Sequence, residues 1–436
     1  MAKITIVTCV YPPEPIVAGR MCRDLASFLV ENGHAVNVLC PFPSRPLGVN
    51  HPGLESRNEA YRRNENGVTV IRLPSYTAPQ SRLFSRLRES FSFGRHAVLV
   101  LQRHLRDSDV VYDMSWPLLG QALVSRGAGR LGVPLVTNIQ DIYPESLLEK
   151  LPRPVRILLA EPLRGIDRRT VRRAKRLVVI SENMKQIYFQ SRGIPQERIV
   201  RVPTWQDERP FWPVPARGSA AKRYGVASDV FTFIYLGNLG PVAGVESLIH
   251  AFHRADLPWA QLLIIGEGSR KEACQALAGE LGCKNVRFIS DPDVNKVPLL
   301  QSLADVCLLP VKRGAAFSSI PSKLAAYQFS GKPVLAAVDS GSDTARAVEE
   351  SQGGWVGEPE NVNWIAKQME TVAQIPCAEL QQIGLRGQAY GLKNYSRAKW
   401  VAVLSDVVLS AAKQGADLRS DFHQRSCVLR NSGMSS

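Results

Sequence analysis

A loop with three potential phosphate-binding residues, Gly237, Asn238 and Gly240, follows an apolar run at residues 230–236. A segment with helical character begins shortly afterwards, at residue 244. Backbone N–H groups at the start of a helix can bind phosphate oxygens, and glycine lets a ligand come close to the backbone. The loop therefore predicts a phosphate site, although a tight turn between a strand and a helix has the same pattern.

Lys312, Ser322 and Lys323 follow another apolar run, at residues 306–310. Ser322 suits the N-cap of a helix, which places Lys323 in the first turn. A cation is unfavourable near a helix N-terminus unless an anion is bound there. This conflict predicts a bound phosphate, although Lys323 could also be an ordinary surface lysine.

The first half of the chain has polar residues in comparable positions. Asp141 and Glu145 lie in a loop after the apolar run at residues 134–138. Two carboxylates there could bind sugar hydroxyls or act as general acid and base, although Asp141 could instead cap a local turn. Gly19 and Arg20 open a predicted helix after the first strand, where backbone N–H groups could bind phosphate or sugar oxygens.

Several other kinds of chemistry have no support in the sequence. It contains no G-x-S-x-G, H-E-x-x-H or P-loop motif, and no G-x-G-x-x-G motif for a dinucleotide. The eight cysteines are scattered without a C-x-x-C pair, so neither a zinc site nor a disulfide framework is expected. We predict no metal site, and a cytosolic protein with reduced thiols.

The elements that position these residues alternate between short apolar strands and helices, first over residues 4–181 and again over residues 230–356. This alternation predicts an α/β fold with parallel sheets that are covered on both faces. A proline-rich stretch separates the two series, and 436 residues exceed what one core normally supports. The predicted divisions are a first domain at 1–204, a linker at 205–225, a second domain at 226–395, a last helix at 396–413 and a disordered tail at 414–436.

The net charge of +15 is concentrated in two segments. Residues 81–106 have six arginines against one glutamate, and residues 151–176 have nine basic residues against two acidic ones. In the first segment Phe84 and Phe91 lie beside the arginines on one helical face, a pattern typical of an interfacial membrane helix. The alternatives are an amphipathic helix packed on its own domain and, for the second segment, a solvated helix face. No nucleic-acid-binding signature accompanies the charge, so no nucleic-acid partner is expected.

Taken together, residues 3–410 resemble the bacterial glycosyltransferases of family 4, which have the GT-B fold. The resemblance rests on the order of several motifs. These are Tyr11-Pro12-Pro13, Gly19-Arg20, Gly33-His34, residues 141–146, residues 237–240, residues 266–268, residues 304–306, Pro321-Ser322-Lys323-Leu324 and Gly331-Lys332-Pro333. Residues 141–146 and 321–324 are most similar to those of a subgroup that resembles L-fucosamine transferases and builds O-antigen, capsule or exopolysaccharide units.

The resemblance implies two Rossmann-like domains that face each other across a cleft, the first on the acceptor side, with the last helix crossing back to it. It implies that residues 237–240, Lys323 and Lys312 bind the diphosphate of a nucleotide-sugar donor, with Gly19 and Arg20 closing from the first domain. Asp141 and Glu145 would contact donor or acceptor and carry the catalysis. Such enzymes retain the anomeric configuration and need no metal or cofactor beyond the nucleotide sugar, here expected to be a UDP-linked N-acetylated deoxysugar.

The resemblance further implies a lipid-linked saccharide acceptor and a cytoplasmic enzyme at the inner face of the membrane, held to anionic lipid by the two basic segments. The sequence departs from the family pattern in two places. Ser318 and Ala326 replace its Glu-x7-Glu pair, and Asn238 and Ala243 replace the two basic residues of its phosphate loop. Two alternatives stay open: a sugar-nucleotide 2-epimerase, which shares the fold, and a catalytically inactive partner subunit, which the replaced residues would explain.

Overall fold

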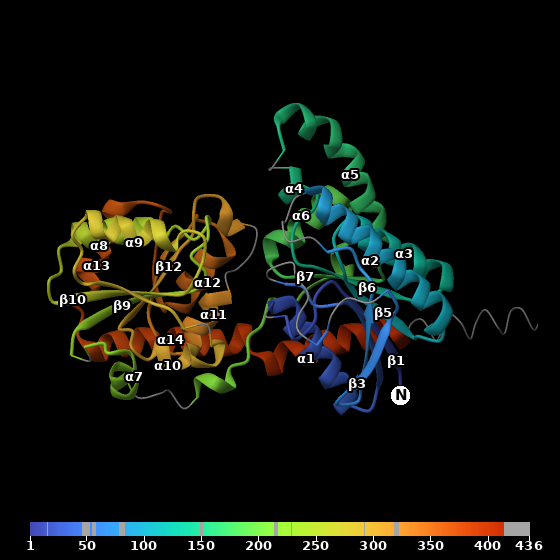
Figure 1. Cartoon of the computed structure of the whole chain (residues 1–436), viewed down its shortest axis with the longest axis horizontal. Helices are drawn as coiled ribbons and strands as arrows, with labels where there is room; N and C mark the ends of the chain where they lie inside the picture. Colours follow the sequence, from blue (N-terminus) through green and yellow to red (C-terminus); the bar gives the residue numbers. More distant parts are fainter. Residues whose placement is uncertain are drawn as a thin grey trace, which may run out of the picture. The chain divides into compact units, whose positions relative to one another are not determined.

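A computed structural model describes residues 1–14, 16–45, 53–54, 58–77, 83–148, 151–212, 217–227, 229–291, 293–317 and 322–413. It divides into two compact units (Figure 1). The first unit comprises Met1–Val202 with the described residues from Trp400 onward, and the second unit comprises Pro203–Lys399. The segment predicted as a linker includes a helix of the second unit, α7 (Arg217–Tyr224). The predicted tail lies outside the described residues.

The first unit is built on an eight-stranded sheet with the order β3-β4-β2-β1-β5-β6-β7-β8. Its strands are β1 (Lys3–Thr8), β2 (Ala35–Pro41), β3 (Tyr61–Glu65), β4 (Val68–Leu73), β5 (Val110–Met114), β6 (Leu135–Ile139), β7 (Arg176–Val179) and β8 (Ile199–Arg201). All neighbouring pairs are parallel except β3 and β4. The strand order reverses between β1 and β5, which makes their carboxyl ends the expected place for a ligand.

The edge strand β3 was not predicted from the sequence. Its residues, YRRNE, are mostly exposed and polar, so it lacks an apolar run. It is held by a tight hairpin in which Asn66 and Gly67 both have positive φ, 51° and 86°. Asn-Gly is the preferred pair for such a turn, so the hairpin could have been predicted from its turn residues although the strand itself has no apolar pattern.

The helices of the first unit cover both faces of its sheet. They are α1 (Val17–Glu31), α2 (Leu83–His104), α3 (Leu119–Leu131), α4 (Glu145–Leu148), α5 (Arg153–Arg173) and α6 (Glu182–Arg192). On α2, Phe93, Ala97 and Leu101 are fully buried in a core shared with α3 and the sheet. On the same helix Phe84 is 85% exposed and Phe91 50%, so α2 is both a packed helix and a carrier of exposed aromatic side chains.

The second unit has a six-stranded sheet, entirely parallel, with the order β11-β10-β9-β12-β13-β14. The strands are β9 (Phe231–Leu236), β10 (Ala260–Ile265), β11 (Val286–Ile289), β12 (Val306–Pro310), β13 (Val334–Ala337) and β14 (Gly354–Gly357). Here the order reverses between β9 and β12. The phosphate-binding candidates at 237–240 and Lys312 directly follow these two strands.

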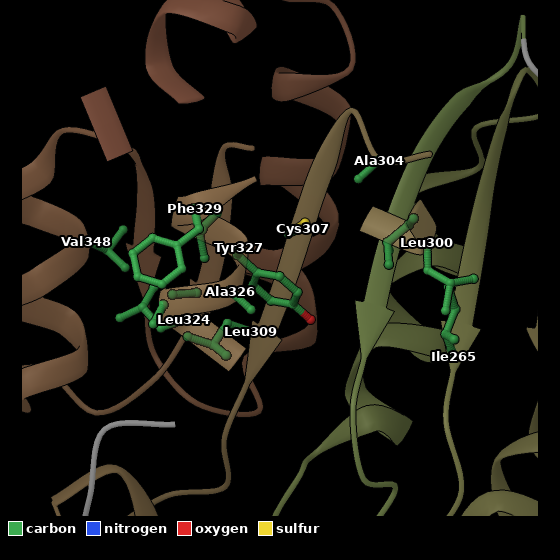
Figure 2. Close-up of a cluster of buried hydrophobic side chains, with 14 of the residues drawn as sticks. Ile265, Leu300, Ala304, Cys307, Leu309, Leu324, Ala326, Tyr327, Phe329 and Val348 are labelled. Carbon is green, nitrogen blue, oxygen red and sulfur yellow. The ribbon is translucent and has the colours of Figure 1, made fainter. Parts of the chain in front are cut away.

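Two cores hold the helices of this unit against its sheet. The helices after α7 are α8 (Val245–Ala255), α9 (Lys271–Glu280), α10 (Val297–Gln301), α11 (Ser322–Phe329), α12 (Asp343–Ser351), α13 (Val362–Val372) and α14 (Cys377–Tyr395). The helices α8, α9 and α13 pack on one face, and α10, α11 and α12 pack on the other. Figure 2 shows the second core, where Leu324, Tyr327 and Phe329 of α11 lie among strand side chains. This core fixes α11, and therefore Lys323, relative to β9.

The prediction of an α/β protein with two parallel-sheet units is confirmed. A last helical segment spans residues 397–413. Among the described residues, no helix is both long and apolar enough to cross a lipid bilayer.

Candidate active site

Lys323 is held at the reversal point of the second sheet by a tyrosine of β9. Its Nζ donates a hydrogen bond to the Tyr235 hydroxyl at 2.9 Å and lies 4.3 Å from the centre of the same ring. The Tyr235 hydroxyl in turn donates to the carbonyl oxygen of Asn238 at 2.7 Å. A chain of two hydrogen bonds thus joins the lysine of α11 to the loop after β9.

The ammonium group of Lys323 has no acidic partner among the residues that the structure describes. Burial lowers the pKa of Lys323 to about 8, because an unpaired charge is disfavoured away from water. A Cβ on Gly237 would lie 3.2 Å from Lys323 Nζ, so the lysine and the glycine backbone border the same space. A partly buried cation beside an open glycine backbone is suited to bind an anion.

Close packing of glycine backbones fixes the shape of the loop at 237–240. Leu239 N donates to Glu267 O at 2.8 Å, and Arg270 N donates to Leu239 O at 2.9 Å. A Cβ on Gly266, whose φ is 141°, would lie 2.1 Å from the carbonyl oxygen of Gly237. Only glycine fits there, so the second glycine loop, 266–268, supports the first. Asn238 itself is exposed and Gly240 is buried.

The helix α8 begins at this loop without a side-chain cap. Its N-cap is Gly244 in the left-handed conformation, φ 66°, so the N-cap residue supplies no side-chain acceptor to the first N–H groups of the helix. Glu246 in the first turn is paired with Arg270 at 2.7 Å. Lys312 is partly buried next to Gly244, and its backbone N–H donates to Val242 O at 3.0 Å. Of the predicted donor-binding residues, Lys323 therefore lies beside Gly237, and Lys312 lies beside Gly244 at the start of α8.

The other candidates in this unit have a more limited description. Ser322 is the first residue of α11, but its side chain and the preceding residues lie outside the described part of the chain, so the N-cap prediction stays a prediction. Ser318 also lies outside. Ala326 is buried in the apolar core, where the family's second glutamate is expected.

The first unit has a pocket of about 260 Å³ at the reversal point of its own sheet. Loops after β1, β5 and β6 form it, together with side chains of α2, α5 and α6. The lining includes Val10, Arg45, Arg86, Ser115, Trp116, Asn138, Gln140, Asp141, Tyr143, Asp167 and Tyr188. Asp141 is exposed at this pocket, in agreement with its predicted place at the carboxyl end of a strand.

Glu145 is not part of the pocket lining and is engaged elsewhere. Its two oxygens accept hydrogen bonds from Arg192 at 2.6 Å and Arg164 at 3.2 Å. Burial raises the pKa of Glu145, but the two arginines outweigh that effect and hold the pKa below its usual value. A carboxylate held ionised by two arginines is poorly suited to donate a proton, so these contacts favour a positioning role for Glu145. Its catalytic role stays a prediction.

Arg192 is the centre of that ion-pair network. Its side chain is 1% exposed and also binds Asp167 at 2.7 Å and the carbonyl oxygen of Tyr143 at 2.9 Å. These bonds join α6 to α5 and to the loop after β6. The network therefore holds the wall of the pocket that contains Asp141 and Tyr143.

Gly19 and Arg20 lie in the first turn of α1 and do not line the pocket. A Cβ on Gly19 would lie 3.2 Å from the backbone of Tyr11, so this glycine permits close packing of α1 on the preceding loop. Arg20 is exposed. Their predicted contact with a donor stays a prediction.

Three residues of these sites were missed by the sequence reasoning. Trp116 and Gln140 directly follow β5 and β6, so the rule that singled out Asp141 also applies to them. Tyr235 gave no local signal, because it lies within a strand and its partner Lys323 is 88 positions away.

The family described as "Glycosyl transferase 4-like domain" matches residues 18–205, and "Glycosyl transferases group 1" matches residues 217–388. The chain belongs to the family 4 glycosyltransferases. The two matches span most of the chain and divide it where the structure does.

Curated relatives of this glycosyltransferase bear related names. The chain is 26% identical to the putative colanic acid biosynthesis glycosyl transferase WcaI of Escherichia coli K12, over 74% of this chain and 80% of that protein. It is 25% identical to the probable glycosyltransferase WbjE of Pseudomonas aeruginosa, over 65% of this chain and 68% of that protein.

Solved structures establish the fold of the glycosyltransferase as GT-B. The sucrose-phosphate synthase of Thermosynechococcus elongatus matches with a TM-score of 0.72 at 14% identity, covering 93% of this chain and 98% of that one. WaaG, a glycosyltransferase involved in lipopolysaccharide biosynthesis, matches with 0.65 at 17% identity over 93% and 99%. Anabaena HepE in complex with UDP and glucose matches with 0.67 at 15% identity over 94% and 100%.

Proposed function

We propose that this glycosyltransferase transfers a sugar from a nucleotide-diphosphate donor to a lipid-linked saccharide during the synthesis of a bacterial surface polysaccharide. The main support for a donor site is the partly buried ammonium of Lys323, which lies beside Gly237 and has no acidic partner among the described residues. The names of WcaI and of WaaG support a role in polysaccharide or lipopolysaccharide synthesis, and the HepE complex supports UDP as the nucleotide.

In the proposed mechanism the diphosphate of the donor lies against residues 237–240 and the first turn of α8. Lys323, oriented by Tyr235, and Lys312 compensate the negative charge that develops as the nucleotide leaves. The backbone N–H groups and the ammonium groups are already in place before the reaction, so they need not reorganise as charge develops on the leaving diphosphate. Such preorganised electrostatic stabilisation usually makes the largest contribution to lowering the activation barrier. The charge compensation is supplied by protein groups, so we propose a metal-independent reaction. Retention of configuration is proposed on the basis of the family alone. The donor is taken to be a UDP-linked N-acetylated deoxysugar.

Two alternatives to a transferase stay open, and each has its own test. An inactive partner subunit would bind no nucleotide, whereas an epimerase would isomerise the donor in the absence of any acceptor lipid. Donor incubated with the protein alone, and followed by NMR, separates the epimerase from the transferase.

The first prediction concerns the nucleotide. UDP is expected to stabilise the wild-type protein, by about 2.7 kcal/mol at a concentration 100-fold above its dissociation constant, and GDP and dTDP to stabilise it less. Lys323→Ala is expected to abolish this gain because it removes the cation beside the diphosphate. Thermal unfolding with each nucleotide measures the effect. Lys367→Ala, which removes an exposed lysine of α13, is the control and keeps the response. Equal stabilisation of the wild type and Lys323→Ala would overturn the donor site.

The second prediction concerns the membrane surface, and rests on apolar side chains exposed beside arginines. On α5, Ile157 is 76% exposed and Leu158 74%, next to the exposed Arg153. On α2, Phe84 is exposed as well. Arginines attract anionic lipid by about 1 kcal/mol each, and apolar side chains gain energy by entering the interface.

The protein is therefore expected to sediment with phosphatidylglycerol vesicles and not with phosphatidylcholine vesicles. The double variant Ile157→Ser/Leu158→Ser should weaken this binding by about tenfold or more, since each side chain contributes more than 1 kcal/mol when buried. The double variant Leu385→Ser/Leu392→Ser removes two leucines of α14 that are 43% and 44% exposed, and serves as the control. If both double variants bind anionic vesicles as the wild type does, α5 is not the membrane contact.

A further inference from the structure

Glu14 is a buried carboxylate in the loop between β1 and α1, and it binds backbone N–H groups of two loops. The residue is 3% exposed. Its Oε1 accepts hydrogen bonds from Ser44 N and Arg45 N, both at 2.9 Å, and its Oε2 accepts one from Tyr11 N at 3.3 Å. The carboxylate therefore joins the loop after β1 to the loop after β2, about 30 positions further along the chain.

A buried arginine of β4 binds the same part of the fold through carbonyl oxygens. Arg72 is 2% exposed, and its guanidinium donates to Pro12 O at 2.7 Å and to Pro41 O at 3.4 Å. Glu14 thus accepts hydrogen bonds from the backbone of these segments, and Arg72 donates hydrogen bonds to it. Hydrogen bonds that involve a charged group are stronger than those between neutral groups, so the loop after β1 is firmly fixed to the end of β2.

The side chain of Arg45 borders the pocket of the first unit and is held at its far end as well. Its guanidinium binds Glu89 of α2 at 2.7 Å and lies over the ring of Trp116, 4.9 Å from the ring centre. An arginine side chain has many rotamers, and contacts that restrict them in advance reduce the entropy lost when a substrate binds. The bond from Arg45 N to Glu14 fixes the near end, so the guanidinium is in place before any substrate is present.

The hydrogen bonds of Glu14 require a carboxylate. A glutamine side chain has the same size, but its amide group offers one oxygen and an NH2 group that can only donate. Three N–H groups are directed at the two oxygens of Glu14, so an amide would place its NH2 group against at least one of them. A buried donor left without an acceptor is costly, and we therefore expect the loop that contains Arg45 to move.

We propose that Glu14 is a positioning residue for glycosyl transfer and that it acts through Arg45. It holds the backbone of Arg45 and thereby keeps the guanidinium over Trp116 at the wall of the pocket. Charged groups that are in place before the reaction usually contribute most to catalysis, and a displacement of about 1 Å can slow a reaction about 100-fold. The role in transfer rests on the proposed function, whereas the positioning of Arg45 by Glu14 does not.

The role in transfer is tested with the full-length protein in a strain of its native host from which the gene has been deleted. Glu14→Gln removes one acceptor oxygen, and Arg45→Met removes the guanidinium but keeps an unbranched side chain. Glu31→Gln makes the same change as Glu14→Gln at an exposed residue at the end of α1, and is the matched control. Surface polysaccharide is quantified in each strain.

The positioning is measured separately on the purified proteins. Fluorotryptophan labelling gives each of the seven tryptophans a fluorine NMR resonance, and Trp116→Phe assigns the resonance of Trp116. Amide hydrogen exchange of the segment with Ser44 and Arg45 reports the bonds to Glu14. Thermal unfolding with and without UDP reports the second unit on the same samples.

Glu14→Gln and Arg45→Met are each expected to lower the amount of surface polysaccharide by about tenfold or more, whereas Glu31→Gln restores it fully. In Glu14→Gln the Trp116 resonance should shift, and exchange at Ser44 and Arg45 should be about tenfold faster, because bonds to a charged acceptor are lost. In Arg45→Met the exchange should stay slow. Stabilisation by UDP should be unchanged in all variants.

Full restoration of the polysaccharide by Arg45→Met would overturn the proposal, and so would a Trp116 resonance of Glu14→Gln at the wild-type position. If Glu14→Gln does not fold, Glu14→Asp takes its place, since aspartate keeps the charge but is too short to hold both loops. If the deletion strain keeps its surface polysaccharide, the proposed function fails, and fluorine NMR and hydrogen exchange still decide whether Glu14 positions Arg45.

Discussion

Replacing Arg192 by alanine is expected to lower the free energy of unfolding of the first unit by about 3–5 kcal/mol. The guanidinium is 1% exposed and binds Asp167, which is 5% exposed, as well as Glu145. Its removal leaves a buried carboxylate without compensation, and this desolvation cost, more than the loss of attraction, makes the change severe. Urea unfolding followed by hydrogen exchange of α5 and α6 reports this unit separately.

The pH dependence of that loss identifies its cause. Burial already raises the pKa of Asp167 to about 6, against the opposing effect of Arg192. Without Arg192 the pKa rises further, so the folded state binds a proton more tightly than the unfolded state does. Stability of the variant should therefore increase as the pH falls from 7 towards 5. A loss that is constant over this range would indicate lost packing instead of a stranded charge.

Arg164→Ala is the matched control, because Arg164 also binds Glu145 but its side chain is 42% exposed. An exposed ion pair contributes about 0–1 kcal/mol, so this variant should be close to the wild type. The double variant Arg192→Leu/Asp167→Leu should recover part of the stability that Arg192→Ala loses, since apolar residues often replace a buried pair without cost. Equal losses in Arg192→Ala and Arg164→Ala would contradict the role of Arg192 as the centre of the network.

Local sequence patterns predicted the elements well because each element has a local cause. The strands β1, β9 and β12 are apolar runs bounded by glycine or proline, and their order of alternation with helices decides the fold class. The strand β3 has no apolar run, because it is an exposed edge, and only its hairpin turn marked it. The reversal of strand order, and hence the position of both sites, follows from topology that no local window contains.

The roles of single side chains were harder to predict because they depend on partners distant in sequence. Glu145 had the residue type and position of a catalytic acid, but its carboxylate is bound by Arg192, 47 positions away. Lys323 lies beside Gly237, and the family resemblance had implied that both face the diphosphate. Its state of ionisation could not be predicted, because the burial that lowers its pKa comes from packing of α11 against β9.

Because the pKa of Lys323 is low, the affinity for UDP is expected to fall about tenfold for each pH unit above 8. Lys323 has a pKa of about 8 in the free protein, below its ordinary value of 10.5. A bound diphosphate stabilises the ammonium form, so above pH 8 binding must first take up a proton. The terminal phosphate of UDP is already fully ionised there, with a second pKa near 6. Burial raises the pKa of Tyr235, so the tyrosine stays neutral and does not contribute.

Calorimetric titration with UDP between about pH 7 and pH 10 measures this dependence. At about pH 9, buffers of different ionisation enthalpy should reveal the uptake of nearly one proton. Lys323→Ala should bind UDP weakly at every pH, and its affinity should not change slope near pH 8. Lys312→Ala should bind UDP more weakly than the wild type, but its affinity should still begin to fall near pH 8. The pKa of Lys323 is about 8 in the folded protein and 10.5 in the unfolded chain, so the buried ammonium lowers the free energy of unfolding below pH 8. This destabilisation disappears as the pH rises from 8 to 10.5. Lys323→Met should therefore be at least as stable as the wild type without UDP, because the variant has no buried charge. A wild-type affinity that does not change across pH 8 would show that the phosphate charge is compensated elsewhere.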